Sequence, residues 1–244
     1  MAGSKRNAPD LVTRLADARE RWRDPLLTAL TVLLVLLMFV VAPLHAAGVL
    51  HAQAYGIGVG LVMVAGVFVM SASPVAVAAM LVAIGLLVVA GLLPSSEEAR
   101  LNVRFEAAAW VTIGFALIWV VARAVFAPGR VTYHRIVGAV LLYLTIGLVF
   151  VGLFTLTGLV SPGSFSGLRI DNAPGLASEL IYFSFVTLTS IGYGDIFPVH
   201  PLARSLCNVE GIIGQLYPAT LLARLVTLGL EGRPLPARRR RADA

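Results

Sequence analysis

Apolar segments of about helix length recur along the chain and are separated by short polar or proline-containing links. A helix needs about 20 mostly apolar residues to cross a hydrocarbon core about 30 Å thick. The pattern therefore predicts six membrane-spanning helices, at residues 25–41, 53–70, 74–93, 107–126, 135–160 and 202–228. The first boundary is open, because residues 44–50 are also apolar and the second helix can begin there.

Turn-forming residues mark the ends of these predicted helices. A proline occurs at each break, at Pro43, Pro74, Pro94, Pro128 and Pro162. Links this short favour hairpins between neighbouring helices.

The link before the last helix has a different pattern. A polar section, residues 161–177, precedes an apolar helical segment, residues 178–187, which is too short to cross a membrane. We interpret this segment as a re-entrant helix that enters the membrane and returns to the same side. The expected fold class is an all-α integral membrane protein with six transmembrane helices plus a re-entrant helix and loop.

Composition excludes a soluble globular protein. The chain of 244 residues is 58% hydrophobic and only 13% charged, which is more apolar surface than one soluble core can bury. The one cysteine, Cys207, excludes an intramolecular disulfide, and we expect a buried, inert thiol there.

The basic residues, which give a net charge of +6, gather at the chain ends and in short links. Membrane topology explains this distribution better than nucleic acid binding does, so no nucleic acid partner is expected. The excess of basic residues on cytoplasmic loops places both termini in the cytoplasm of a multi-pass protein in a bacterial-type plasma membrane. The link before the last helix then lies outside the cell.

The two ends of the chain are polar. Residues 1–24 do not resemble a cleaved signal, and we expect a cytoplasmic segment that is either an interfacial amphipathic helix or disordered. Residues 229–244 form a basic cytoplasmic tail that includes Arg238, Arg239, Arg240 and Arg241. These arginines are either a binding site for anionic lipid or a topology signal alone.

The most informative string follows the short apolar helix and reads Thr187-Leu188-Thr189-Ser190-Ile191-Gly192-Tyr193-Gly194-Asp195. A cation that loses water in a narrow pore needs other oxygens at a similar distance, and inward-facing backbone carbonyls can supply them. Gly192 and Gly194 reach positive φ without a steric penalty, so alternate peptides can turn their oxygens toward one axis. A simple glycine-rich turn requires neither the Thr/Ser run nor the aspartate.

This string, from Thr189 to Asp195, resembles the signature of tetrameric potassium channels. The resemblance implies a homotetramer with four-fold symmetry, in which the string is the selectivity filter and K⁺ is the permeant ion, with no cofactor. It implies that the carbonyls of Ser190, Ile191, Gly192 and Tyr193 form the K⁺ sites, with Gly194 completing the filter. It also divides the chain into a sensor-like four-helix domain, residues 25–133, and a pore module, residues 134–228.

Two departures from the family pattern concern the filter and its support. Ser190 replaces the commoner threonine, which keeps the hydroxyl but loses a methyl that stiffens the rotamer, so we expect a looser innermost site. Some relatives place a carboxylate where this chain has Val186, so Asp195 needs another partner. By resemblance that partner is Tyr182, whereas Phe183 can only pack. Supporting roles for the filter are expected for the residues Thr187, Thr189, Asp195, Tyr182 and Phe183.

The last helix carries the candidate gate. Gly211, Gly214 and Pro218 are places where it can bend, or where it can simply pack closely. Glu210 is either a buried carboxylate that its neighbours satisfy or a side chain that faces water. The fourth predicted helix has Arg104 and Arg123 at its two ends and no charge between its first and last turns, so we expect little intrinsic voltage dependence.

Three other classes of function compete with a potassium channel. A K⁺ uptake transporter subunit usually contains paired repeats, and this chain has one filter string. A weakly selective cation channel remains an alternative. No nucleophile motif, metal-ligand cluster or phosphate loop supports an enzyme, and the glycines at residues 56–60 favour helix packing over nucleotide binding.

Overall fold

The computed structural model describes residues 25, 27–50, 62, 74–92, 99–125, 133–170 and 175–231. Its main helices are α4 (Pro74–Leu92), α5 (Ala99–Val125), α6 (Tyr133–Val160), α7 (Leu176–Leu188) and α8 (Pro201–Glu231). Two short strands, β1 (Phe165–Ser166) and β2 (Phe197–Pro198), form an antiparallel pair. The chain is therefore mostly helical, as the apolar pattern predicts.

The first helix continues further than predicted. It runs from Leu27 to Ala46 and contains the π-helical segment η1 (Leu37–Val41) and the short helix α2 (Ala42–Ala46). The prediction that Pro43 breaks this helix is wrong, because proline fits the first turn of α2, where its missing N–H is not needed. The turn comes instead at Gly48, which has a φ of +73°.

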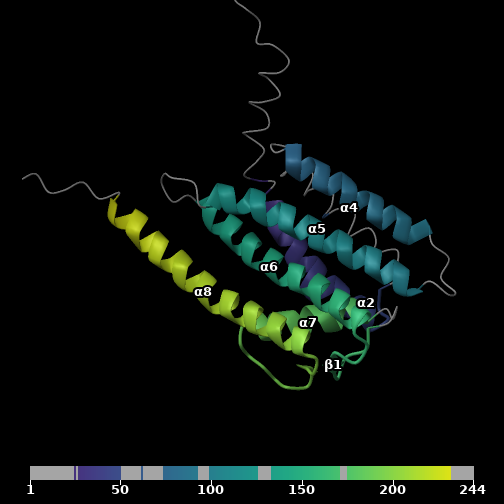
Figure 1. Ribbon diagram of the computed structural model, residues 1–244. Helices are drawn as coiled ribbons and strands as arrows, with labels where there is room; N and C mark the ends of the chain where they lie inside the picture. Colours follow the sequence, from purple (N-terminus) through teal and green to yellow (C-terminus); the bar gives the residue numbers. More distant parts are fainter. Residues whose placement is uncertain are drawn as a thin grey trace, which may run out of the picture.

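Helices α4, α5 and α6 lie side by side as successive hairpins, and α8 lies against α6 and α7 (Figure 1). One hydrophobic cluster joins the first helix to α4, α5 and α6, with Leu34, Met80, Val121 and Leu141 among its most buried members. The predicted sensor-like helices therefore share a core with the outer helix of the predicted pore module.

Three of the described helices are long and apolar enough to cross a membrane: Leu27–Ala46, Val103–Arg123 and Ile136–Val160. Helix α5 begins at Ala99 rather than at residue 107, because Val103 and Ala107 lie one turn apart on a buried face while Arg104 remains exposed. Three stretches lie outside the described residues: the N-terminal segment 1–24, the glycine cluster 56–60 and the arginines at 238–241. The predicted second span, residues 53–70, also lies outside them, apart from Val62.

Candidate ion-conducting site

A cluster of aromatic rings fixes the position of α7, the predicted re-entrant helix. Phe183 of α7 packs on Phe154 of α6 at 5.0 Å between ring centroids and on Phe165 of β1 at 5.4 Å. Phe154 and Phe165 are themselves 5.6 Å apart. Edge-to-face contacts of this kind add to the burial of large rings. Phe183 thus packs, as expected, and holds the short helix against the outer helix.

The chain leaves α7 through a tight turn. The amides of Ile191 and Gly192 both donate to the carbonyl of Val186, at 2.9 and 3.3 Å. The hydroxyls of Thr187 and Thr189 donate back to carbonyls one helical turn earlier, at 2.9 and 2.5 Å. Because α7 includes Thr187 and ends at Leu188, the non-helical stretch begins at Thr189 rather than at Thr187.

Every second residue of the next stretch has a left-handed backbone. The φ angle is +58° at Ser190, +60° at Gly192 and +82° at Gly194. Among the described residues other than glycine, only Ser190 has a positive φ. An alternation of this kind turns successive carbonyl oxygens toward the same side of the chain. Positive φ at the two glycines is the conformation that the sequence predicts, whereas the value at Ser190 is not predicted from its residue type.

The outer end of this stretch is held by the predicted pair of side chains. The hydroxyl of Tyr182 donates to Oδ2 of Asp195 at 2.8 Å. The rings of Tyr182 and Tyr193 stack almost parallel, with centroids 6.3 Å apart. With no carboxylate at Val186, Asp195 was expected to find its partner in Tyr182, and the structure contains this hydrogen bond.

The comparisons with known proteins agree with this geometry. Residues 148–231 match the model of the ion channel family, a stretch that contains α7, the filter string and α8. The inward rectifier potassium channel Kirbac3.1 of Paramagnetospirillum magnetotacticum is 37% identical over 75 residues, which are 28% of this chain and 25% of that protein. We refer to residues 148–231, the stretch that matches this ion channel family model, as the channel domain.

A second group of relatives matches a similar length. Protein LctB of Geobacillus stearothermophilus and that of Bacillus caldotenax are each 35% identical over 66 residues, 27% of this chain and 46% of each relative. The alignments thus span less than half the length of these relatives. No solved structure matches the chain. The matched family is one of ion channels, not of enzymes, in agreement with the sequence prediction.

The channel domain has a support behind the exit of the filter that the sequence does not reveal. Gly167, with a φ of +80°, lies so close to the Asp195 carbonyl oxygen that a Cβ there would collide with it. The amides of Val199 and His200 donate to the Ser164 carbonyl at 2.8 and 3.2 Å. Together with the β1–β2 pair, these contacts tie the outer end of the filter to the end of α6.

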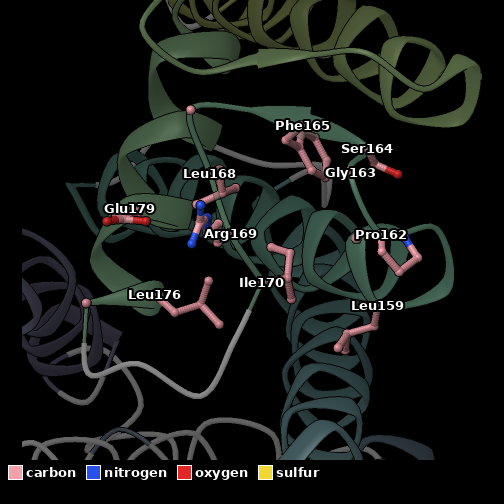
Figure 2. Close-up of a pocket in the computed structure, with 13 residues that line it drawn as sticks. Leu159, Pro162, Gly163, Ser164, Phe165, Leu168, Arg169, Ile170, Leu176 and Glu179 are labelled. Atoms are coloured by element: carbon pink, nitrogen blue, oxygen red, sulfur yellow. The ribbon is translucent and has the colours of Figure 1, made fainter.

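A pocket of about 790 Å³ lies beside this support, between the end of α6, β1 and the start of α7 (Figure 2). Arg169 and Glu179 line one side of it, and Pro162 and Phe165 line another part. None of residues 189–195 lines this pocket.

At the inner end of the filter, the channel domain contributes a side chain that the sequence analysis missed. The Nε2 amide of Gln215, on α8, donates to the hydroxyl of Ser190 at 2.9 Å. Both side chains are exposed in the single chain. The available signal was an isolated amide among the apolar residues of α8, one residue after Gly214.

The hinge candidates lie within a continuous helix, α8, which contains Pro218 in its interior. A Cβ at Gly214 would collide with the carbonyl oxygen of Leu188, whereas one at Gly211 would be 3.9 Å from the carbonyl oxygen of Thr187. Gly214 therefore permits close approach to the end of α7. Bending at Gly211, Gly214 or Pro218 stays a prediction.

Glu210 is buried, with no exposed surface, so the alternative in which it faces water is wrong. One carboxyl oxygen lies 2.5 Å from the hydroxyl of Ser184, on α7. Glu210 thus sits at the contact between α7 and α8.

Proposed function

We propose that this chain is one subunit of a potassium-selective channel, in which residues 189–195 form the filter and K⁺ passes down its gradient. The observation that carries the proposal is the alternation of left-handed residues at Ser190, Gly192 and Gly194, directly after a helix too short to cross a membrane. In this conformation the carbonyls of Ser190, Ile191, Gly192 and Tyr193 can replace the water around a K⁺ ion.

A homotetramer follows from the same requirement, because one strand cannot surround an ion. Ile191 and Tyr193 are 55% and 70% exposed in the single chain. Large apolar residues on α8 are exposed as well, among them Ile212, Leu216 and Leu222. Contact with neighbouring subunits would cover these surfaces. In that assembly Tyr182, Thr187, Thr189 and Asp195 support the filter from behind.

The pore helix adds an electrostatic contribution. Its C-terminal end carries roughly half a negative charge, and it points toward the inner side of the filter near Thr187. Four such ends, one from each subunit, would stabilise a cation in the cavity below the filter.

The arrangement in the membrane is part of the proposal. We infer six transmembrane helices with both termini in the cytoplasm of a bacterial-type membrane, based on the apolar pattern and the distribution of basic residues. We propose weak voltage dependence because α5 has no arginine between Arg104 and Arg123, whereas a voltage sensor needs several arginines at three-residue spacing. Anionic lipid at Arg238, Arg239, Arg240 and Arg241 remains a proposal from sequence alone.

The experiment that tests this function is K⁺ flux into proteoliposomes that contain the purified chain. We expect passive flux that dissipates a K⁺ gradient, with Gly192→Ala abolishing it because alanine is strained at a φ of +60°. Gly48→Ala is the matched control: its φ of +73° imposes similar strain in an open turn after the first helix, away from the filter, so flux should persist. K⁺ flux that occurs only together with a second ion, in a fixed ratio, would indicate a transporter instead.

A further inference from the structure

Three helices of the channel domain meet at one buried hydroxyl. Ser184 of α7 has no exposed surface, and its Oγ lies 2.9 Å from the carbonyl oxygen of Gly147 on α6. The same Oγ lies 2.5 Å from Oε1 of Glu210 on α8. The three oxygens therefore form a continuous chain from the inner helix through the pore helix to the outer helix.

The number of protons shared by these three oxygens decides whether Glu210 is ionised or protonated. A serine hydroxyl has one proton, and a backbone carbonyl has none. If Glu210 were ionised, its carboxylate and the Gly147 carbonyl would compete for that one proton, and one of the two short contacts would join bare oxygen atoms. If Glu210 is protonated, Oε1 donates to Ser184, Ser184 donates to Gly147, and each contact contains a proton.

The surroundings of Glu210 favour the neutral acid. Its other oxygen, Oε2, is buried and has no hydrogen-bond partner within the described part of the chain. No basic side chain forms an ion pair with it among those residues. The titratable groups that interact with it electrostatically are Tyr143 of α6 and Cys207 of α8, which carry no positive charge. An unpaired carboxylate in such a place is costly, whereas a neutral carbonyl-type oxygen costs much less.

We propose that Glu210 is a protonated carboxylic acid and a positioning residue for the filter, which it holds through Ser184. Ser184 lies two residues before Val186, whose carbonyl accepts the amides of Ile191 and Gly192. The chain Glu210–Ser184–Gly147 therefore fixes the pore helix, and with it the start of the filter, relative to both flanking helices. The positioning part rests on the proposed channel function, whereas the protonation part does not.

The first test is the infrared spectrum of the full-length protein in lipid at neutral pH. We expect the C=O band of a protonated carboxylic acid in the wild type and its loss in Glu210→Gln. Glu179→Gln, which removes an exposed glutamate from the first turn of α7, is the matched control and should leave the band unchanged. A wild-type spectrum without this band would overturn the proposal.

The second test is K⁺ flux. Glu210→Gln keeps a donor for Ser184, so flux should stay near the wild-type value. Glu210→Leu and Ser184→Ala each remove the hydrogen bond between residues 184 and 210. Each should lower flux about tenfold, the equivalent of one buried hydrogen bond of roughly 1.4 kcal/mol. Equal losses in Glu210→Gln and Glu210→Leu would contradict the neutral acid. Absence of wild-type flux together with a clear acid band would overturn the channel function and the positioning role, and would support the protonated state.

Discussion

At the scale of single residues, the filter is unusual at its inner end, where Ser190 replaces a threonine. The expected looseness of this site is offset in the structure by Gln215, whose amide contacts the Ser190 hydroxyl. The hydrogen bond from the Gln215 amide favours one rotamer of Ser190. In threonine, the methyl group restricts the rotamer in the same way. The hydroxyl oxygen keeps a second lone pair for an ion.

This compensation predicts a non-additive pair of substitutions. Gln215→Leu should weaken block by Ba²⁺ from the cytoplasmic side several-fold in the wild type, since loss of one hydrogen bond is worth about 0.5–1.5 kcal/mol. In the Ser190→Thr background the same change should have little effect, because the methyl restores the rotamer. Block measured in single-channel recordings of the four proteins gives the coupling. Equal effects of Gln215→Leu in both backgrounds would show that Gln215 does not position Ser190.

The outer end of the filter depends on Tyr182 and Asp195. Tyr182→Phe removes the hydrogen bond of 2.8 Å and keeps the ring stack with Tyr193. We expect the tetramer to be less stable by about 1 kcal/mol and Na⁺ permeability to rise, measured by thermal unfolding and by reversal potentials.

Tyr143→Phe is the control for this variant, because the Tyr143 hydroxyl makes no hydrogen bond among the described residues while its ring stacks on Tyr217. A Tyr182→Phe channel as stable and selective as the Tyr143→Phe channel would remove the supporting role of Tyr182.

Sequence reasoning succeeds at this scale where a residue type has one structural meaning. Gly192 and Gly194 predict positive φ because only glycine adopts it without cost, and the aspartate predicts a donor nearby. It fails for Gln215 with Ser190 and for Ser184 with Glu210, because these partners are 25 and 26 residues apart and lie on different elements of the fold. Contacts of this kind depend on how α7 and α8 pack.

At the scale of elements, the inner helix α8 is defined by its contact with the end of α7. The sequence identifies Gly211 and Gly214 as equivalent candidates for a hinge. The structure separates them, because only Gly214 has a backbone oxygen, that of Leu188, in the place of a side chain.

The two glycines therefore predict different outcomes on substitution by alanine. Gly214→Ala forces α7 and α8 apart and should cost about 1–3 kcal/mol, seen as a lower unfolding temperature of the tetramer in K⁺. Gly211→Ala makes an ordinary contact and should fold normally. If Gly211→Ala also leaves the open probability unchanged, Gly211 has a packing role only. Equal stability of Gly214→Ala and the wild type would contradict the close approach.

The limits of helices were predictable to within a few residues where polar and apolar positions change abruptly, as at α4, α6 and α8. The end of the first helix was not predictable from Pro43, because the first turn of a helix tolerates proline and the preceding turn widens into a π-helix. The start of α5 was not predictable either, because its first turns combine charged residues with a buried apolar face.

At the scale of the whole molecule, the first helix, α4 and α5 pack on the outer helix of the channel domain through a common core. Helix α5 has Arg100, Arg104 and Glu106 near its start and Arg123 near its end. Moving one charge through the full field gains only about 2.3 kcal/mol per 100 mV. We expect Arg104→Gln and Arg123→Gln to leave the conductance–voltage relation unchanged. A shift of its slope in either variant, recorded in planar bilayers, would show that these helices sense voltage.

The central claim is that backbone oxygens of Ser190 to Tyr193 select K⁺ by replacing its water. The most direct test is the reversal potential of the purified protein in a planar bilayer, with K⁺ on one side and Na⁺ on the other. The account predicts a large reversal potential of the sign expected for K⁺ permeation, retained in Gly48→Ala. A reversal potential near zero would show a weakly selective cation pore and would contradict the account.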